Sequence, residues 1–186
     1  MGNIHQGESD IQMDEMISGL EDNVTKEIAR ASIIEIKSRK ELKKFRQDNG
    51  WNINWESIPK SIIVYALALQ ETKEVQGLIG IKNDVLSHAV FIHWMASAPQ
   101  NNKYMYGVQK YRGVGRNLVA IAIKKSVQWG YEGVVHGYAA NIKLLKYYMA
   151  AFGAEYLGML HQYHFLIDEV QAKRLMEEND YERDET

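Results

Sequence analysis

The chain has 186 residues, of which 46% are hydrophobic and 25% are charged, with a net charge of -2. This length accommodates one domain with a substantial core, and the nearly balanced charge gives no overall basic field that would point to nucleic acid. The absence of cysteine excludes disulfides, thiolate zinc sites and a cysteine nucleophile, and it fits a reducing compartment. No stretch approaches the roughly 18 uninterrupted apolar residues of a membrane helix. We therefore expect a cytoplasmic protein without a membrane partner.

The N-terminal segment, 1–28, is polar and acidic and lacks the features of a signal peptide. It allows a short amphipathic helix, and a partly disordered tail is the open alternative. The apolar residues of that helix would be Ile11, Met13, Met16, Ile17 and Leu20. One domain is expected over 29–167, followed by a C-terminal helix and acidic tail over 168–186.

The segment after residue 28 predicts a strand, a helix and an antiparallel meander. Ser38, with Glu41 three residues later, forms a capping box for a helix over 39–47. Apolar runs separated by short polar turns predict the strands. These strands are expected over 31–36, 61–69, 75–81 and 88–97, with the last turn at Lys82, Asn83 and Asp84.

Alternation along the strand predicted over 88–97 divides its side chains between two faces. One face is expected to carry Phe91, His93, Met95 and Ser97, and the other Val90, Ile92, Trp94 and Ala96. Pro99 ends the strand, and a polar loop over 100–109 follows it.

A stretch with two glycines, Lys110-Tyr111-Arg112-Gly113-Val114-Gly115-Arg116, precedes the strongest helical pattern. Gly113 and Gly115 allow a close backbone approach to a ligand or a positive φ. The first N–H groups of the helix would point at an anion, with the positive end of the helix dipole behind them. Lys110, Arg112 and Arg116 add positive charge. The stretch therefore predicts a seat for a phosphate-bearing ligand, although it lacks the Gly-Lys-Ser/Thr ending of a P-loop and the third glycine of a dinucleotide fingerprint.

The remaining chain alternates between helices and strands. An apolar arc predicts a helix from Gly115 to about Gln128, packed against a sheet. Asn141 is expected to cap a helix over 144–152, which Gly153 closes. The other elements expected are strands over 133–139, 154–160 and 163–167 and a last helix from Glu169 to about Glu178. This order indicates an α/β fold with a mixed sheet and helices on its faces.

Two motifs in this order resemble those of the GNAT superfamily of acetyl-CoA-dependent N-acetyltransferases. The first is the family's phosphate-cradling pattern, Gln/Arg-x-x-Gly-x-Gly/Ala, which here is Lys110-Tyr111-Arg112-Gly113-Val114-Gly115. The second is a helix that starts at an asparagine, contains a tyrosine and ends in glycine, here Asn141 to Gly153. The resemblance covers residues 31–167. It departs from the family at Lys110, which keeps the charge but loses the guanidinium fork.

The resemblance implies a mostly antiparallel central sheet with a V-shaped split, flanked by helices on both faces. It also implies acetyl-CoA as co-substrate and no metal. The pyrophosphate would lie on the N–H groups from Arg112 to Arg116, and the pantetheine arm would pair with the end of the strand over 88–97. The cofactor-binding residues so implied are Met95, Ala96, Ser97, Lys110, Arg112, Gly113, Val114, Gly115, Arg116, Asn141 and Tyr148.

In the family an amine attacks the thioester directly. This reaction needs a deprotonated amine, a donor for the oxyanion and a proton for the leaving thiolate. Counting from Asn141 places the family's acid at Tyr148. Counting back from Gly153 places it at Met149, because this helix is one residue longer than usual. Tyr147 is a further candidate.

His93 is the candidate general base, since the usual pKa of histidine lies near neutrality. The family often has a glutamate in this neighbourhood, and this strand has none. A histidine that simply packs in the strand is the alternative interpretation. Glu71, at the end of the strand over 61–69, is another candidate base, and deprotonation through water needs no base residue.

The predicted function is N-acetyl transfer to a primary amine of a small molecule, peptide or protein. A non-catalytic acyl-CoA-binding or protein-interaction module and a nucleotide-binding α/β protein stay open as alternatives. No nucleic acid partner is expected except charged tRNA, and assembly of the chain as a homodimer stays open. By analogy with the family, Trp51 and Trp55 would line the acceptor groove, although such a pair more commonly fills a core.

Two further features have ordinary explanations. The segment 100–109, with Tyr104 and Tyr106, is longer than usual for the family and is interpreted as a surface excursion, with a lid or a substrate contact as alternatives. His161 and His164 would face opposite sides of a strand and have no nearby carboxylate, so they do not predict a metal site.

Overall fold

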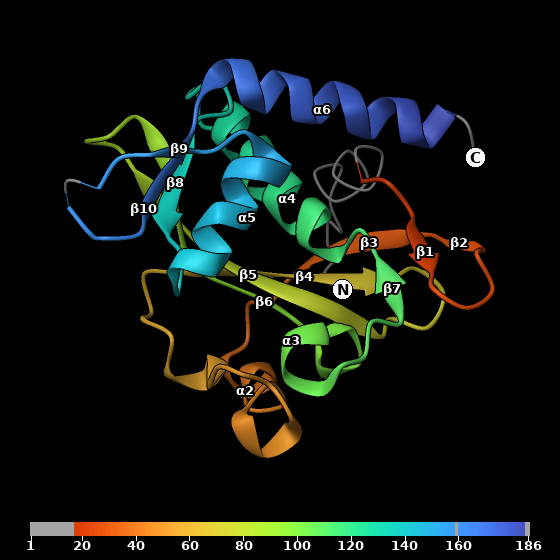
Figure 1. Cartoon of the computed structure of the whole chain (residues 1–186). Helices are drawn as coiled ribbons and strands as arrows, with labels where there is room; N and C mark the ends of the chain where they lie inside the picture. Colours follow the sequence, from red (N-terminus) through yellow and green to blue (C-terminus); the bar gives the residue numbers. More distant parts are fainter. Residues whose placement is uncertain (1–16, 159, 185–186) are drawn as a thin grey trace, which may run out of the picture.

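The computed structural model describes residues 17–158 and 160–184, which form two sheets with helices around them (Figure 1). The strands are β1 (Leu20–Asp22), β2 (Ile28–Ala29), β3 (Ala31–Glu35), β4 (Ile63–Leu69), β5 (Val75–Asp84), β6 (Ala89–Ser97), β7 (Tyr111–Arg112), β8 (Val135–Tyr138), β9 (Glu155–Tyr156) and β10 (His164–Ile167). The helices are α2 (Arg39–Leu42), α3 (Lys103–Tyr106), α4 (Val114–Gln128), α5 (Ile142–Phe152) and α6 (Glu169–Asp184), with short 3-10 turns η1 (Gln47–Asn49), η2 (Trp55–Ser57) and η3 (Pro99–Asn101).

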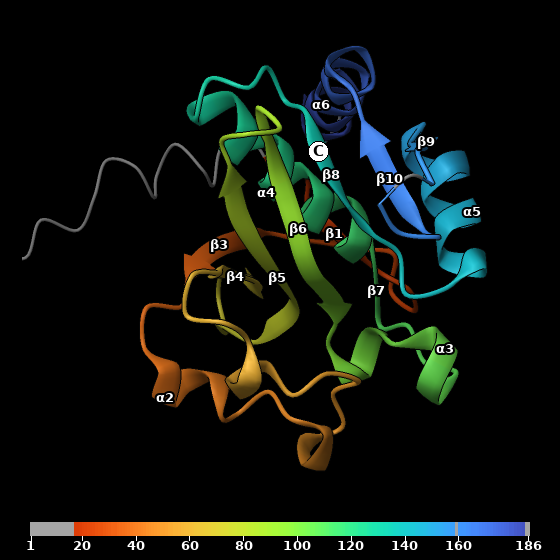
Figure 2. The same cartoon turned by 90° about the vertical axis from the view of Figure 1, so that its left-hand side faces the viewer.

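The main sheet has the strand order β3-β4-β5-β6-β8-β10-β9 and is antiparallel except between β6 and β8. Those two parallel strands pair only from Val90↔Val135 to Ile92↔Gly137. Beyond Gly137 they diverge, which opens the sheet as a V toward their C-terminal ends (Figure 2). A Cβ at position 137 would lie 2.9 Å from the Ile92 carbonyl oxygen, so glycine permits the close approach at the apex of the split. The predicted mixed sheet with a V-shaped split is confirmed.

Helices cover both faces of this sheet, as predicted. α4, α5 and α6 lie on one side, and α2 and α3 lie on the other (Figure 1). Strand β4 serves both sides, because Tyr65 and Leu67 enter the core under α4 while Val64 and Ala66 enter the core over α2. A strand that is apolar on both faces is suited to such a central position, and each fully buried large apolar side chain contributes about 1.5–3 kcal/mol.

A β-bulge at His93 makes the predicted faces of β6 wrong. Gly80 pairs with Trp94 and the next residue of β5, Ile81, pairs with Ile92, so His93 is an extra residue in β6. The alternation shifts by one position after the bulge. Met95 consequently packs against the α4-side core that contains Ile92, whereas Trp94 and Ala96 belong to the α2-side core.

Three local predictions are also wrong. Helix α2 begins at Arg39 as predicted but ends at Leu42 instead of near 47, and the Ser38 side chain makes no capping hydrogen bond. The residues predicted as a turn, 82–84, are paired within β5, and the turn falls at 85–88 instead. The segment predicted as a loop contains η3 and α3, whose cap is Asn102.

The described part of the N-terminal segment forms a hairpin rather than a helix. Residues 11–16 of the predicted helix lie outside the described residues. β1 pairs with β2 through Leu20↔Ala29 and with β7 through Glu21↔Arg112, which gives a small second sheet beside the start of α4. At the other end of the chain, the predicted last helix begins at Glu169 and runs to Asp184. Within 17–158 and 160–184, no helix combines the length and the apolar content needed to cross a membrane.

Candidate active site

The N-terminal end of α4 is a helix start without a side-chain cap. Gly113 occupies the N-cap position with φ +90°, a conformation that other residues adopt only at a cost. No side chain accepts a hydrogen bond there, and the first turn of α4 has no acidic residue. The first N–H groups of a helix have no intrahelical partner, and they lie at the positive end of its dipole. This end of α4 therefore suits an anion.

Gly115 lies within the first turn of α4 and has no internal reason to be glycine. A Cβ at this position would meet nothing within 4 Å, and the φ of Gly115 is not in the left-handed region. Gly77, in contrast, needs to be small because a Cβ there would lie 2.9 Å from Val114. Glycine in a helix costs about 0.5–1 kcal/mol relative to alanine. The open surface over Gly115 is what a ligand resting on the helix backbone would require.

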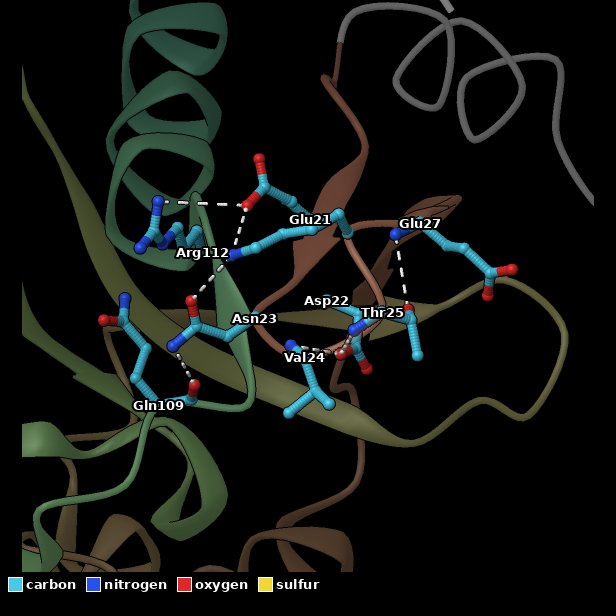
Figure 3. A network of polar contacts seen from close by, with 9 residues as sticks. Glu21, Asp22, Asn23, Val24, Thr25, Glu27, Gln109 and Arg112 are labelled. Atoms are coloured by element: carbon cyan, nitrogen blue, oxygen red, sulfur yellow. Dashed lines mark hydrogen bonds and ion pairs between the residues drawn. The ribbon is translucent and has the colours of Figure 1, made fainter.

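The N-terminal hairpin holds the start of α4 in place. Residues 113–116 at this start are called the phosphate seat below, after the ligand predicted for them. Fully buried Asn117 donates to the carbonyl oxygens of Ser18 at 3.1 Å and Gly113 at 3.2 Å, and it accepts a hydrogen bond from the Ser18 hydroxyl at 3.2 Å. Asn23 donates through its side chain to the carbonyl oxygen of Gln109 at 3.0 Å (Figure 3). Its backbone N–H donates to the carbonyl oxygen of Lys110 at 2.7 Å. These contacts fix the chain on both sides of Gly113.

The basic side chains around the seat already have acidic neighbours. Arg112 lies 3.8 Å from the carboxylate of Glu21, which also accepts from Lys26 at 3.4 Å (Figure 3). Arg116 lies 3.6 Å from Glu178 of α6. Exposed ion pairs contribute only about 0–1 kcal/mol each, so a phosphate could replace either carboxylate at small cost.

The split lies next to this seat. Met95, Ala96 and Ser97 pair with β5 on one side, and no residue of β8 pairs with them on the other. Ser97 is the cross-strand partner of Gly77, which packs against Val114 at the start of α4. The structure therefore brings the predicted strand edge and the predicted phosphate seat together, and half of the backbone groups of this edge point into the split.

Helix α5, which follows β8 after a three-residue connection, carries the two candidate tyrosines. Its cap is Asn141, whose side chain accepts from the backbone N–H of Leu144 at 2.9 Å. Tyr148 is buried, with its ring against Phe165 at a centroid distance of 5.0 Å. Burial raises the pKa of the Tyr148 phenol, which is therefore protonated at neutral pH.

Tyr147 is more open and lies among charged and phenolic neighbours. Its side chain is 46% exposed, whereas that of Tyr148 is 6% exposed. Burial raises the pKa of Tyr147, and Tyr104 adds to this effect while Arg116 opposes it. Met149 is exposed and carries no proton to donate. Tyr104, Tyr147 and Arg116 thus place α3, α5 and the phosphate seat within electrostatic range of one another.

The segment 100–109 contacts two other parts of the chain. The Lys143 ammonium of α5 lies 5.0 Å from the centre of the Tyr104 ring. The Tyr106 hydroxyl donates to the carbonyl oxygen of Gly50 at 2.8 Å. The segment therefore links α5 to the region of Trp51 and Trp55, beyond the end of β6. Those two tryptophans are themselves buried in the α2-side core, which supports the core interpretation and not the groove.

His93, the candidate base, lies at the bulge just past the apex of the split. Its ring packs near those of Phe91 and Trp94, with centroid distances of 6.2 and 5.0 Å. Burial lowers the pKa of His93, so the imidazole is neutral at pH 7 and able to accept a proton. Glu71 is exposed in the β4–β5 turn, and β5 separates it from β6, so the structure does not bring it to the split.

A hydrogen-bonded chain of three titratable residues beside the apex, two buried histidines and a half-buried aspartate, was missed by sequence reasoning. His136 hydrogen-bonds through Nε2 to Asp84 at 3.0 Å and through Nδ1 to Nε2 of His164 at 3.1 Å. Burial opposes ionisation of Asp84, but hydrogen bonds from Ser87 and His136 outweigh it and lower the pKa of the carboxyl. Burial lowers the pKa of both histidines. The one available signal was His136 itself, a polar residue in the middle of an apolar strand.

An open groove of ≈ 620 Å³ between α4 and α6 lies apart from these residues. Its lining includes Val127, Val170 and Met176 and contains neither a histidine nor a tyrosine. It adjoins the C-terminal half of α4, away from Gly113. The candidate chemistry is therefore at the split and not in this groove.

Comparison with known proteins supports the fold. No family model matches the chain, and no curated protein matches its sequence. The solved structure of AtaTR bound with AcCoA is similar, with a TM-score of 0.53 and 13% identity over 78% of this chain and 97% of that chain. A tyrosine-to-phenylalanine variant of KacT has a TM-score of 0.50 and 11% identity over 78% and 98%. A tyrosine-to-phenylalanine mutant of the AtaT toxin has a TM-score of 0.50 and 12% identity over 78% of this chain and 93% of that chain.

Because the sequence identities are this low, the structural similarity establishes only the fold. The neighbours are GNAT acetyltransferases, and the chain has the GNAT fold. The expectation of that fold from the glycine stretch and the Asn141 helix is confirmed.

Proposed function

We propose that the protein is an N-acetyltransferase that transfers an acetyl group from acetyl-CoA to a primary amine. The observation that carries this proposal is Gly115, a helical glycine with open space over it at an uncapped helix start. Arg112 and Arg116, on either side of Gly115 in the sequence, would add positive charge for a phosphate. The GNAT-fold structure of AtaTR, which was solved with AcCoA bound, is consistent with the same cofactor here.

In this proposal the pyrophosphate lies on the backbone between Gly113 and Arg116. The guanidinium groups of Arg112 and Arg116 exchange Glu21 and Glu178 for phosphate oxygens, and Lys110 adds charge at the edge. The pantetheine arm follows the free edge of β6. The remaining cofactor contacts come from Met95, Ala96 and Ser97 of that edge and from Asn141 and Tyr148 of α5.

The reaction that follows is a direct displacement. The neutral amine attacks the thioester carbon, a tetrahedral oxyanion forms, and the C–S bond then breaks. Tyr148 gives its proton to the leaving CoA thiolate, with the more open Tyr147 as the alternative donor. The amine nitrogen loses a proton to His93, directly or through water. Proton transfers by positioned side chains contribute roughly 10²–10⁴-fold to such rates.

Ligand-dependent stability tests the cofactor, and thiol release tests the reaction. CoA or acetyl-CoA at 100 times its dissociation constant should raise the free energy of unfolding by about 2.7 kcal/mol, and ATP or NAD should not. Stabilisation by ATP or NAD without stabilisation by CoA would contradict the proposal. If CoA binds but no amine in a panel causes thiol release from acetyl-CoA, the protein is a non-catalytic acyl-CoA-binding module and not an enzyme.

A further inference from the structure

Five aromatic rings form a continuous band across the apex of the split. This aromatic band consists of Trp94, His93, Phe91, Tyr138 and His161. Consecutive ring centroids are 5.0, 6.2, 5.3 and 4.6 Å apart. The band joins β6 to β8 and to the turn before β10.

The band lies on the face of the sheet that α4 does not cover. Ile92 belongs to the α4-side core, so its neighbour Phe91 projects to the other face, where it contacts His136 at 5.1 Å. His93 and Tyr138 are the first residues of β6 and β8 after the last pair, Ile92↔Gly137. In Figure 2, β6 and β8 cross in front of α4, so the face turned to the viewer is this one. A cofactor seated on α4 and passing through the split would present its acyl group here.

The rings are partly uncovered but firmly supported. Tyr138 is 42% exposed and His161 is exposed, while the other three rings are half-buried. Fully buried Trp55 supports Trp94 from below, at a centroid distance of 6.0 Å. A fixed row of aromatic rings favours a flat apolar partner, because rings stack face to face or edge to face with little loss of conformational freedom.

The charge around the band disfavours a polycationic partner. None of its five members is acidic, and Asp84, which hydrogen-bonds to the Phe91 neighbour His136 at 3.0 Å, already has a partner. A surrounding of low polarity also lowers the pKa of an amine, which favours the neutral form that attacks a thioester.

We propose that the aromatic band binds the body of the acceptor, and that the acceptor is a primary amine joined by a short chain to an aromatic ring. Its ring packs against Phe91 and Tyr138, and its amine lies beside His93. The proposal rests on the proposed acetyl transfer, because the band is located where the acyl group would emerge. It distinguishes this acceptor class from polyamines, whose additional ammonium groups are favoured by neighbouring carboxylates.

The test is calorimetric titration of the CoA-saturated protein with three amines. 2-Phenylethylamine should bind about 3–10-fold more tightly than 2-cyclohexylethylamine, which has the same chain without the aromatic ring, and more tightly than spermidine. Phe91→Leu and Tyr138→Leu should each weaken 2-phenylethylamine binding by a similar factor, and Tyr138→Phe should not. Tyr156→Leu is the matched control, since Tyr156 is an exposed tyrosine paired with Phe165, whose side chain enters the α4-side core.

Equal binding of the two ring analogues, or tighter binding of spermidine, would overturn the band proposal. A second readout is the imidazole proton resonances of His93 and His161, which should shift when 2-phenylethylamine is added to the wild-type protein; unshifted resonances would also overturn it. Failure of the proposed function is a separate result, because it appears as absent stabilisation by CoA, and the same amine titration can then be made without CoA.

Discussion

The N-terminal end of α4 and the apex of the split are built in different ways. The first is made of backbone: a left-handed Gly113, an uncapped first turn and an open surface at Gly115, with a hairpin holding the chain in place. The second is made of side chains, among them His93 and Tyr138, whose positions depend on a bulge and on pairing between distant strands. The proposed anion binding therefore needs a local motif, whereas the proposed acyl transfer needs the assembled sheet.

Substitution of Gly115 should have the largest effect on the first region. Gly115→Glu should weaken CoA binding by more than about 100-fold, because a carboxylate would occupy the phosphate seat and repel its occupant. Gly115→Ala should weaken CoA binding less and raise the free energy of unfolding by about 0.5–1 kcal/mol, since alanine favours the helix. Calorimetry with CoA and urea unfolding measure the two quantities.

The proposal specifically predicts that Gly115→Ala weakens CoA binding while it raises the free energy of unfolding. A Gly115→Ala protein that is destabilised would mean that the fold itself needs glycine at this position. A folded Gly115→Glu protein with unchanged CoA affinity would show that the pyrophosphate does not bind at the start of α4.

Substitution of Tyr148 tests the second region. Tyr148→Phe keeps the buried ring and removes the proton, so turnover with acetyl-CoA and an accepted amine should fall about 10–100-fold with little change in CoA affinity. Tyr147→Phe is the matched control on the same helix. A larger loss of turnover in the Tyr147 variant would assign the proton to the more exposed phenol instead.

The same contrast explains which features the sequence could predict. Gly113, Gly115 and the cap at Asn141 act through their own backbone neighbourhood, so local residue types indicated both helix starts. The reversal of faces after His93 could not be foreseen, because an inserted residue changes the alternation without changing the composition of the strand. The chain from Asp84 to His164 joins residues far apart in sequence, and only the order of strands in the sheet brings them together.

The two buried histidines of that chain, His136 and His164, predict acid sensitivity. Burial lowers the pKa of His136 and His164 in the folded protein below the value of 6.5 that applies when the chain unfolds. Below pH 6.5 the unfolded chain therefore binds protons that the folded chain does not. The free energy of unfolding should fall as the pH decreases from about 7 to 5, by at most about 1.4 kcal/mol per pH unit for each histidine.

Urea unfolding at a series of pH values measures this dependence. A double variant, His136→Phe with His164→Phe, keeps two rings but cannot titrate at these positions, so its dependence on pH should be shallower. An equally steep dependence in the variant would assign the titration to other groups. Asp84, whose pKa is lowered, contributes a loss only below about pH 4.

The smallest expected effect concerns Glu21, the carboxylate that already pairs with Arg112, one of the two arginines proposed to bind phosphate. Glu21→Gln removes the charge that lies 3.8 Å from Arg112 but leaves the backbone pairing of β1 with β7 intact. An exposed ion pair of this kind is weak, so CoA affinity should rise by only about two- to threefold. Glu27→Gln is the matched control, because the Glu27 side chain points away from Arg112 (Figure 3).

Salt separates the two roles that Glu21 could have. If Glu21 competes with the phosphates for Arg112, the gain from Glu21→Gln should shrink as salt screens both charges. If Glu21 instead orients Arg112 for the phosphate, Glu21→Gln should weaken CoA binding. The seat would then need a charged side chain from the N-terminal hairpin in addition to the polar side chains that hold it in place. The contrast between a backbone-built seat and a side-chain-built apex would hold only for the glycines.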